Sequence, residues 1–336
     1  MSTRYQPLPR HGFPFGGHSI AGSRDLWFDQ LLRRSRGGQA ELLRADACPH
    51  EVLTRLSAPR AEVAGLTLDR PRIMGILNVT PDSFSDGGDL TTVQAAVDRA
   101  QVWQGDVDIL DIGGESTRPG AEEVDVKEEI RRTAPVIRAL RAAGIATPIS
   151  IDTRKAAVAE AALTAGADIV NDVSAFVFDP ELADLVAERD VPVCLMHAQG
   201  RPETMQDDPR YDDVLFDVVD HLEERIAVAE AAGIRRDRII TDPGIGFGKT
   251  LQHNVTLLRA LALLHDLGLP VLLGVSRKRF IGTLGGVENA RDRVAGSIAV
   301  ALDGVAQGAH ILRVHDVAET AQALRLQNAL IKRDAE

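Results

Sequence analysis

The sequence predicts an α/β fold in which eight parallel strands close into a (β/α)8 barrel, the TIM barrel. Eight short apolar runs are spaced along the chain, and polar or charged residues follow nearly every one of them. Strands that are apolar on both faces indicate a parallel sheet covered by helices, and eight such units in roughly 250 residues are what a closed barrel requires. The predicted strands span residues 73–77, 107–112, 148–151, 168–170, 191–196, 238–241, 269–275 and 311–314.

Several segments between these runs carry apolar residues at the i, i+3, i+4, i+7 spacing of a half-buried helix. The two strongest examples are Val158, Ala161, Ala162 and Ala165, and Leu215, Val218, Val219, Leu222 and Ile226. The structural alternative is an open, doubly wound sheet. Such a sheet usually has fewer repeats and one glycine-rich nucleotide-binding turn at its first crossover, so the barrel is favoured.

The composition limits the possible partners and the compartment. The chain has 336 residues, a formal net charge of -11 and a pI near 5.3. We therefore expect no nucleic acid and no membrane as partner, because neutralising phosphates needs clustered Lys and Arg. No stretch approaches eighteen apolar residues, and residues 1–10 lack the apolar core of a signal peptide. Cys48 and Cys194 lack the spacing of a zinc site. These features favour a reduced, cytoplasmic setting.

Residues 1–61 form an N-terminal extension of unknown role, followed by a barrel domain over residues 62–336. Only residues 27–32 and 41–56 of the extension hint at short helices. A loosely packed extension is favoured over an arm that binds a partner or a second copy. Residues 64–69 alternate in polarity just before the first strand, which predicts a short hairpin that plugs one end of the barrel.

The first four strands end in residues suited to binding a flat, polar ligand. Asn78 ends the first strand, Asp152 the third, and Asn171 lies at the end of the fourth. Taken alone, Asp152 suits the cap of the following helix. If Asp152 faces Asn171 and Asp242, however, the three side chains form a buried set of carboxylates and one amide. Such a set can make hydrogen bonds to a flat heterocycle. After the second strand, Thr117 and Arg118 offer a hydroxyl and a guanidinium for a phosphoryl oxygen.

The last four strands end in a soft wall, a glycine-rich turn and local positive charge. Met196 suits contact with an aromatic ring, whereas His197 is better explained by a local hydrogen bond. Residues 242–250 look like a Walker loop but carry Pro243 where its first glycine is required, so they predict a flexible wall bearing Phe247. The cations after the seventh and eighth strands lie where barrels often bind phosphate, and a solvated turn suits Arg277 and Arg279 better than Lys278 and Arg313.

Taken together, these stretches resemble dihydropteroate synthase, a pterin-binding barrel enzyme of folate biosynthesis and the target of sulfonamides. The resemblance covers residues 62–330. Its motifs lie at residues 76–88, 111–121, 151–155, 171–173, 194–197, 242–249, 276–278 and 313–317. It implies a transferase that condenses 6-hydroxymethyl-7,8-dihydropterin diphosphate with 4-aminobenzoate, with Mg2+ as cofactor, and a homodimer formed through the late helices.

The resemblance also implies a role for each matching residue. The pterin would contact Asp152, Asn171, Asp242, Lys278 and Met196. The diphosphate would contact Asn78, Arg313 and His315, and Asn78 would also bind the metal. The aminobenzoate would contact Thr117, Arg118, Pro119, Phe247 and Lys278. Catalysis would rest on Asp152, Lys278, Arg313 and Arg118. Two positions depart from the pattern, Arg279 where some members carry a small Ser and Ala156 where a Pro often begins the third helix.

The chemistry fits an SN1-like displacement, because cations stabilise the charge that develops on departing diphosphate. We expect the loops that carry Asp82 and Arg118 to fold over the pocket and exclude water. Two alternatives stay open. One is a pterin-binding barrel methyltransferase that works with a corrinoid, against which the diphosphate set speaks. The other is a pterin-binding paralogue without turnover.

Overall fold

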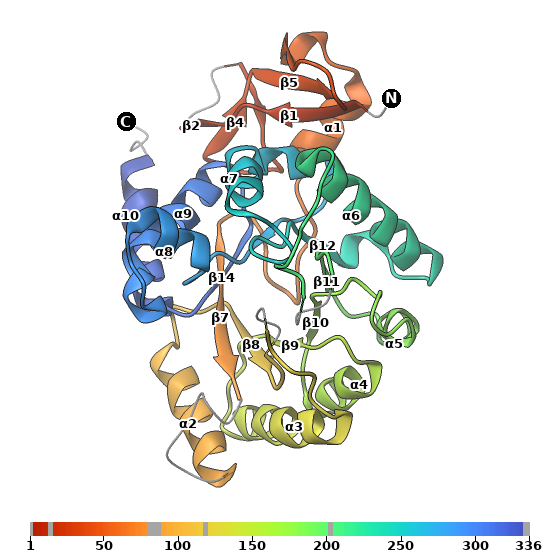
Figure 1. Ribbon diagram of the computed structural model, residues 1–336. Coiled ribbons are helices and arrows are strands. Elements are labelled where there is room, and N and C mark those ends of the chain that lie inside the picture. The colour runs from red at the N-terminus through yellow and green to blue at the C-terminus, as the bar shows by residue number, and fades with distance from the viewer. Residues whose placement is uncertain (1–2, 13–15, 80–88, 117–119, 201–203, 332–336) are drawn as a thin grey trace.

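The computed structural model describes residues 3–12, 16–79, 89–116, 120–200 and 204–331. Its centre is a sheet of eight parallel strands in the order β12-β11-β10-β9-β8-β7-β14-β13 (Figure 1). A parallel bridge between Thr241 and Val271 joins the two ends of this order, so the sheet closes into a barrel. The strands are β7 (Arg72–Asn78), β8 (Ile109–Gly113), β9 (Ile149–Asp152), β10 (Ile169–Asp172), β11 (Val193–Met196), β12 (Ile239–Asp242), β13 (Leu272–Leu273) and β14 (Ile311–Val314).

All eight predicted strands are present, which confirms the barrel. Seven of the starts differ from the prediction by one to three residues, partly because prolines precede some of the strands, and the eighth begins at residue 311 as predicted. Pro192 and Pro270 have no N–H to donate to the ladder, although their carbonyls accept from Val170 N at 3.0 Å and from Thr241 N at 2.9 Å. The seventh strand is shorter than residues 269–275, since only Leu272 and Leu273 pair with β14.

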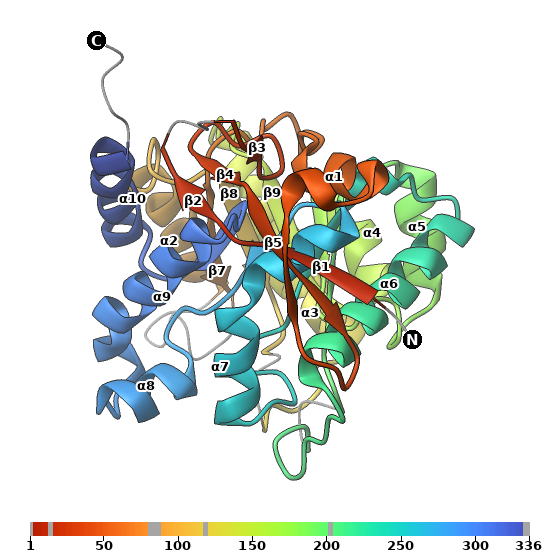
Figure 2. The same ribbon diagram turned by 90° about the horizontal axis from the view of Figure 1, so that it is seen from above.

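Helices follow the strands and cover the outside of the barrel (Figures 1 and 2). The α-helices are α2 (Asp89–Val102), α3 (Val126–Ala142), α4 (Ala156–Ala165), α5 (Glu181–Arg189), α6 (Val214–Ala231), α7 (Leu251–Arg259), α8 (Arg279–Gly285), α9 (Val294–Ala306) and α10 (Val317–Ile331). Short 3-10 helices are η3 (Arg236–Arg238), η4 (Leu261–Leu267) and η5 (Ala290–Arg293). Val158 and Ala162 of α4 and Val218 and Leu222 of α6 are fully buried, as their spacing predicts.

Ala156, which departs from the resembled pattern, begins α4. Its N–H donates to Asp179 Oδ2 at 2.8 Å. A proline in this position has no N–H and cannot make this bond. In this chain the carboxylate of Asp179, just before α5, holds the first turn of α4 in place.

The amino-terminal end of the barrel is filled by apolar side chains. An antiparallel bridge joins Val63 and Leu66, which confirms the predicted short hairpin before β7. Val63 and Leu68 pack into the barrel against inward-facing side chains of the strands. Those side chains are Met74, Ile109, Ile169, Cys194, Ile240, Leu272 and Ile311.

The extension before residue 62 forms two small antiparallel sheets and a helix, and it lies at the amino-terminal end of the barrel strands (Figure 1). Its elements are β1 (Thr3–Pro7), β2 (Arg10–His11), β3 (His18–Ser19), β4 (Leu26–Phe28), β5 (Gln30–Ser35), β6 (Glu41–Arg44), η1 (Ala45–Ala47) and α1 (His50–Ser57). The helix predicted over residues 27–32 is wrong, and the one over 41–56 is right only in its second half. Trp27 pairs with Arg10 and Ser19, so its strand is set by partners outside the local apolar run.

The extension is also bound closely to the barrel, contrary to the expected loose packing. It has a buried core of its own that includes Phe28, Leu31 and Leu56. Three of its arginines donate to barrel carboxylates: Arg4 to Asp220 and Glu223, Arg36 to Asp217 and Asp220, and Arg55 to Asp266. The side chain of Asp266 is 1% exposed, so its pair with Arg55 is the most enclosed of the three.

Replacing Arg55 with alanine is expected to destabilise the protein by about 3 kcal/mol, because the change leaves a buried carboxylate almost unpaired. The remaining cation, Arg4 Nη1, lies 3.9 Å from Asp266 Oδ2, and the backbone of Tyr5 also donates to this carboxylate. Urea unfolding at pH 7.5 measures the effect. Arg44→Ala is the matched control, since Arg44 and Asp46 form an exposed pair within the extension whose loss should change nothing measurable. Equal unfolding curves for the Arg55 variant and the wild type would contradict the prediction.

Candidate active site

The barrel interior changes from apolar to polar along the strands. Side chains of a strand alternate between its two faces, so residues two apart point the same way. Ile109, Ile169, Ile240 and Ile311 face the barrel axis within the plugged cluster. Two residues further along, the same face carries Asp111, Asn171, Asp242 and Arg313. The period of the strands therefore turns four separate sequence positions into one layer of polar side chains.

A second set of predicted residues lies at the same end. In the strand register Asn78 pairs with Gly113, Gly113 with Asp152, and Asp152 with Asn171. Met196 pairs with Asp242 on the other side of the barrel. Residues opposite each other in a sheet share a face. Asn78, Asp152, Asn171, Met196, Asp242 and Arg313 are thus brought together at the carboxyl ends of the strands, where barrel enzymes carry their active sites.

Arg313 binds two buried carboxylates. Its Nε donates to Asp111 Oδ2 at 2.6 Å and its Nη2 donates to Asp152 Oδ2 at 2.7 Å. Both carboxylate side chains are less than a tenth exposed. The guanidinium is held flat between them, and its Nη1 has no partner among the described residues. The sequence analysis left Asp111 without a role, although it stands two residues after the inward-facing Ile109.

One cation shared by two carboxylates leaves negative charge in the layer. Burial raises the pKa of Asp152 to about 7, with Arg313 opposing the rise and Asp111 adding to it. The second oxygens, Asp111 Oδ1 and Asp152 Oδ1, are buried without a hydrogen-bond partner in the described part of the chain. Buried acceptors without donors are costly, so this layer is built to receive N–H groups of a ligand.

Gly113 allows Asn78 and Asp152 to approach each other. A methyl group at this position would lie 3.3 Å from Asn78 Oδ1 and 3.6 Å from Asp152 Cβ, so both side chains flank the glycine. Asn78 is partly exposed at the end of β7. Its amide oxygen therefore lies beside the Asp152–Arg313 pair on the open side of the layer.

Lys278 lies on the opposite side of the layer, near Asp242. Its ammonium donates to the carbonyl of Ile245 and sits 4.4 Å from the centre of the Phe247 ring. Burial lowers the pKa of Lys278 to about 8, while the charge of Asp242 works against the lowering. The pKa of Asp242 is in turn raised by burial and held down by Lys278. The predicted partners Asp242, Phe247 and Lys278 thus form one corner of the site.

The two other cations of the basic turn are used differently. Arg277 makes an ion pair with Asp316, and Arg279 is exposed at the start of α8. His315 lies on the same side as this turn, since its Nδ1 is 3.0 Å from Ser276 Oγ and its N–H donates to the same oxygen at 3.1 Å. Lys278 and Arg313 therefore face the polar layer, as expected, whereas Arg277 holds the turn in place.

A family model described as "Pterin binding enzyme" matches residues 74–315, which span the whole barrel sheet. The chain belongs to the pterin-binding enzyme family. A curated relative, the dihydropteroate synthase of Escherichia coli strain K12, is 47% identical over 272 residues, which are 81% of this chain and 95% of that protein.

Solved structures of pterin-binding enzymes give the same result. The dihydropteroate synthase of Xanthomonas albilineans with 4-aminobenzoic acid has a TM-score of 0.75 and 53% identity, covering 81% of this chain and 98% of that one. The Xanthomonas enzyme in complex with 7,8-dihydropteroate has a TM-score of 0.72 and 50% identity over the same shares. About a fifth of this chain is thus unmatched in these pterin-binding enzymes, a share close to the length of the N-terminal extension.

A buried lysine holds the glycine-rich turn of this family member, and the sequence analysis missed it. Lys249 Nζ lies 2.8 Å from His197 Nδ1 and donates to the carbonyls of Gly244 at 2.9 Å and Phe247 at 3.0 Å. Lys249 is only 2% exposed. His197 therefore makes a structural hydrogen bond, as the sequence favoured, but its partner is distant in the chain. Burial together with Lys249 lowers the pKa of His197 to about 2. Lys249 fixes the wall that carries Phe247.

A second buried network anchors the segment after β8. Glu115 accepts from Arg154 at 2.5 Å and from Lys155 at 2.6 Å, and Lys155 also donates to Glu129 at 2.7 Å. The three predicted aminobenzoate contacts Thr117, Arg118 and Pro119 lie outside the described residues, as does the Asp82 loop. For this part of the site the structure describes only the buried network around Glu115.

Proposed function

We infer that this chain is a dihydropteroate synthase. It condenses 6-hydroxymethyl-7,8-dihydropterin diphosphate with 4-aminobenzoate and gives 7,8-dihydropteroate and diphosphate. The observation that carries the assignment is the pairing of close similarity to named synthases with a single polar layer at the carboxyl end of the barrel. A pterin-binding methyltransferase or a paralogue without turnover would also explain the similarity, but neither requires Arg313 and His315 near Asn78.

The pterin is proposed to lie flat in the polar layer, with its N–H groups toward the carboxylates. Asp152 Oδ1 and Asp111 Oδ1 are the acceptors without donors, and Asn171 adds an amide beside them. Asp242 and Lys278 pair with the other edge of the ring, and Met196 forms a soft wall. Asp111 joins the predicted set because it and Asp152 hold the same guanidinium.

The diphosphate is proposed to lie nearer the rim, against Arg313, His315 and Asn78. Arg313 has its Nε and Nη2 fixed by carboxylates, so its Nη1 is oriented for an anionic ligand. Asn78 offers a hard amide oxygen on the open side, which fits Mg2+, an ion that takes few protein ligands and several phosphate oxygens. When bound, Mg2+ supplies neutralising charge to the diphosphate.

The reaction then begins with cleavage of the bond between the pterin methylene and the diphosphate oxygen. The electron pair leaves with the diphosphate, whose growing charge Arg313 and His315 stabilise more in the transition state than in the ground state. The positive charge left on the dihydropterin is favoured by the Asp152 carboxylate. The aminobenzoate nitrogen forms the new carbon–nitrogen bond and releases a proton. Phe247, Lys278, Thr117, Arg118 and Pro119 are proposed to hold this second substrate.

A narrow pH optimum for pterin binding is expected from Asp152 and Lys278. Asp152 must be ionised to accept N–H groups, and its pKa of about 7 removes the charge below that pH. Lys278 must stay charged, and its pKa of about 8 removes the charge above that pH. Calorimetric binding of 6-hydroxymethyl-7,8-dihydropterin, which lacks the diphosphate, should therefore fall on both sides of this interval.

The matched variant is Lys278→Arg, since a guanidinium stays protonated through this range. It should remove the alkaline fall and keep the acidic one. A flat profile from pH 6 to pH 9 for the wild type would show that neither side chain controls binding.

A homodimer through the late helices is proposed for the assembly. Leu284 of α8 and Leu326 and Leu330 of α10 are 62%, 62% and 85% exposed, and the last two lie one turn apart on the same helix. Large apolar side chains grouped on a surface mark protein contacts. Light scattering after size exclusion distinguishes the dimer from a monomer. We propose a cytoplasmic setting as well; within the described residues, none of the helices has the length and apolar character needed to cross a bilayer.

The deciding experiment measures diphosphate release and dihydropteroate formation by the purified full chain, with and without 4-aminobenzoate and Mg2+. The synthase releases diphosphate only when aminobenzoate is present and forms dihydropteroate in equal amount. A chain that binds the pterin diphosphate and releases nothing is a binding paralogue. Methyl transfer in the presence of a methylcorrinoid, without dihydropteroate, identifies the methyltransferase.

A further inference from the structure

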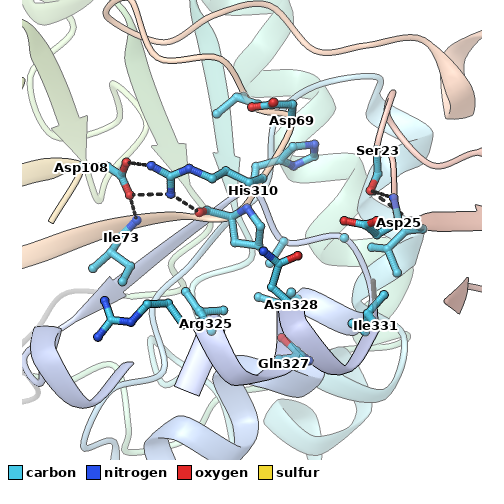
Figure 3. Close-up of a pocket in the computed structure, with 18 of the residues that line it drawn as sticks. Ser23, Asp25, Asp69, Ile73, Asp108, His310, Arg325, Gln327, Asn328 and Ile331 are labelled. Atoms are coloured by element: carbon cyan, nitrogen blue, oxygen red, sulfur yellow. Dashed lines mark hydrogen bonds and ion pairs between the residues drawn. The ribbon is translucent and has the colours of Figure 1, made fainter. Parts of the chain in front are cut away.

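A cavity lies at the other end of the barrel from the polar layer. It has a volume of about 330 Å³ and is lined mainly by three parts of the chain (Figure 3). These parts are the extension around Ile20–Leu26, the segment around Leu68–Ile73 that leads into β7, and the last turns of α10. The extension therefore supplies one wall of the cavity, and the barrel domain supplies the others.

The wall of the cavity is mainly apolar. Its buried members come from all three parts and from the turn before β14. They are Ile20, Ala21, Leu26, Leu68, Ile73, Val305, Ala309 and Ala321. A mainly apolar, partly open cavity of this size with a few polar groups is typical of a site for a small organic molecule.

The charged groups around the cavity are mostly paired with one another. Four carboxylates and two guanidinium groups line it. Arg70 binds Asp108 at 2.5 Å and Arg325 binds Asp106 at 2.6 Å. Asp69 accepts from Thr67 Oγ1 at 2.7 Å and from Arg72 at 3.2 Å.

The carboxylate of Asp25 is the exception. It has no hydrogen-bond or ion-pair partner in the described ranges, and its backbone N–H is held by Ser23 Oγ at 3.3 Å. In Figure 3, Asp25 lies across the cavity from Asp108 and its arginine. The lining therefore has an excess of negative charge, and the carboxylate of Asp25, which is partly exposed, is available to a ligand.

His310 supplies a second oriented polar group. Its Nδ1 accepts from the N–H of Val271 at 3.0 Å, so the ring proton is on Nε2. The residue is 6% exposed and lines the cavity, and Nε2 has no partner among the residues described. Burial keeps the ring neutral by lowering its pKa. An N–H donor that faces the cavity suits a ligand with an oxygen or nitrogen acceptor in addition to a cationic group.

We propose that this cavity is a binding site for a small organic amine with a compact apolar body, such as a fused pair of rings. The protonated amine pairs with Asp25, and the apolar body fills the space between the extension and α10. The excess of carboxylates excludes anions of the diphosphate kind, so this is not a second substrate site. Ile73 and His310 place the ligand beside the first residues of β7 and β14, the strands that end at Asn78 and Arg313.

The test uses three probes that share one ring system and differ in charge, measured by isothermal titration with the full chain at pH 7.5. The probes are 2-naphthylmethylamine, 2-naphthylmethanol and 2-naphthoate. The amine should bind at least tenfold more tightly than the alcohol or the carboxylate. Asp25→Asn should weaken binding of the amine about tenfold and leave binding of the alcohol unchanged, since only the charge pairing is lost.

Two further measurements separate this cavity from the active site. Saturating 6-hydroxymethyl-7,8-dihydropterin should leave the amine's Kd unchanged, and Ala309→Leu, which adds side-chain volume to the cavity wall, should abolish binding of both the amine and the alcohol. Asp46→Asn, an exposed carboxylate of the same extension, is the control and should bind the amine as the wild type does. Equal affinities for the three probes, no effect of Asp25→Asn, or competition with the pterin would each overturn the proposal.

Discussion

Replacing Arg313 with alanine is expected to lower kcat/KM for the pterin diphosphate by about a thousandfold. In the proposed mechanism the side chain donates to the leaving diphosphate, and in the structure it neutralises Asp111 and Asp152, which are both buried. Its loss removes positive charge where negative charge develops and leaves two carboxylates facing each other. Steady-state assays of dihydropteroate formation give the effect.

The stability of the Arg313→Ala protein should depend on pH in a defined direction. Burial already raises the pKa of Asp152 against the opposing charge of Arg313, and loss of that charge raises this pKa further, so Asp152 binds a proton on folding at mildly acid pH. The variant should therefore unfold at a lower urea concentration at pH 8 than at pH 5.5. The opposite order would mean that the two carboxylates are not coupled through Arg313.

The Asp111→Asn variant tests whether Asp111 acts through Arg313. Alone it should lower turnover, because one of two bonds that orient the guanidinium is weakened. Combined with Arg313→Ala it should cost no more than Arg313→Ala does, since residues that act through one another are not additive. Full activity of Asp111→Asn would remove it from the site.

Replacing Lys249 with methionine is expected to cost roughly 3 kcal/mol of stability or more. The ammonium satisfies the ring nitrogen of His197 and the carbonyls of Gly244 and Phe247, all of which are buried or nearly so. Methionine fills similar space but donates nothing, so these acceptors lose their donor. The turn should shift with Phe247, and KM for both substrates should rise more than kcat falls.

Urea unfolding and the two KM values measure this effect, with Lys127→Met as the control. Lys127 is exposed in the first turn of α3, and its replacement should leave both quantities as they are. If the Lys249 variant unfolds with the wild type but loses turnover completely, the lysine takes part in the chemistry and is not a support of the turn.

The barrel and the row of residues at its mouth were predictable because both follow from short periods in the sequence. When Asn78, Asp152 or Asp242 ends an apolar run, the direction of its side chain can be predicted. Strand residues alternate between two faces, and parallel strands all end on one side of the barrel. Asp111 obeys the same rule, and counting two residues on from Ile109 would have found it. The two glycines that follow Asp111 indicate a loop, and this signal hides the strand pattern.

Other features depend on contacts that no local pattern contains. Lys249 resembled the lysine of a phosphate-binding loop, and Pro243 excluded that role without suggesting another. Its true partners are His197, which comes from a different strand, and backbone carbonyls of its own turn. The strand at Trp27 pairs with two short strands that both precede it in the chain, and a run of two or three apolar residues there fits helix and strand alike.

The closed amino-terminal end of the barrel restricts where substrates enter and products leave. With Val63 and Leu68 packed among the inward-facing residues of the strands, molecules can arrive and depart only where the strands finish. In the proposed arrangement the pterin lies deepest, so we expect it to bind before 4-aminobenzoate. We likewise expect the product to leave only after the diphosphate nearer the rim.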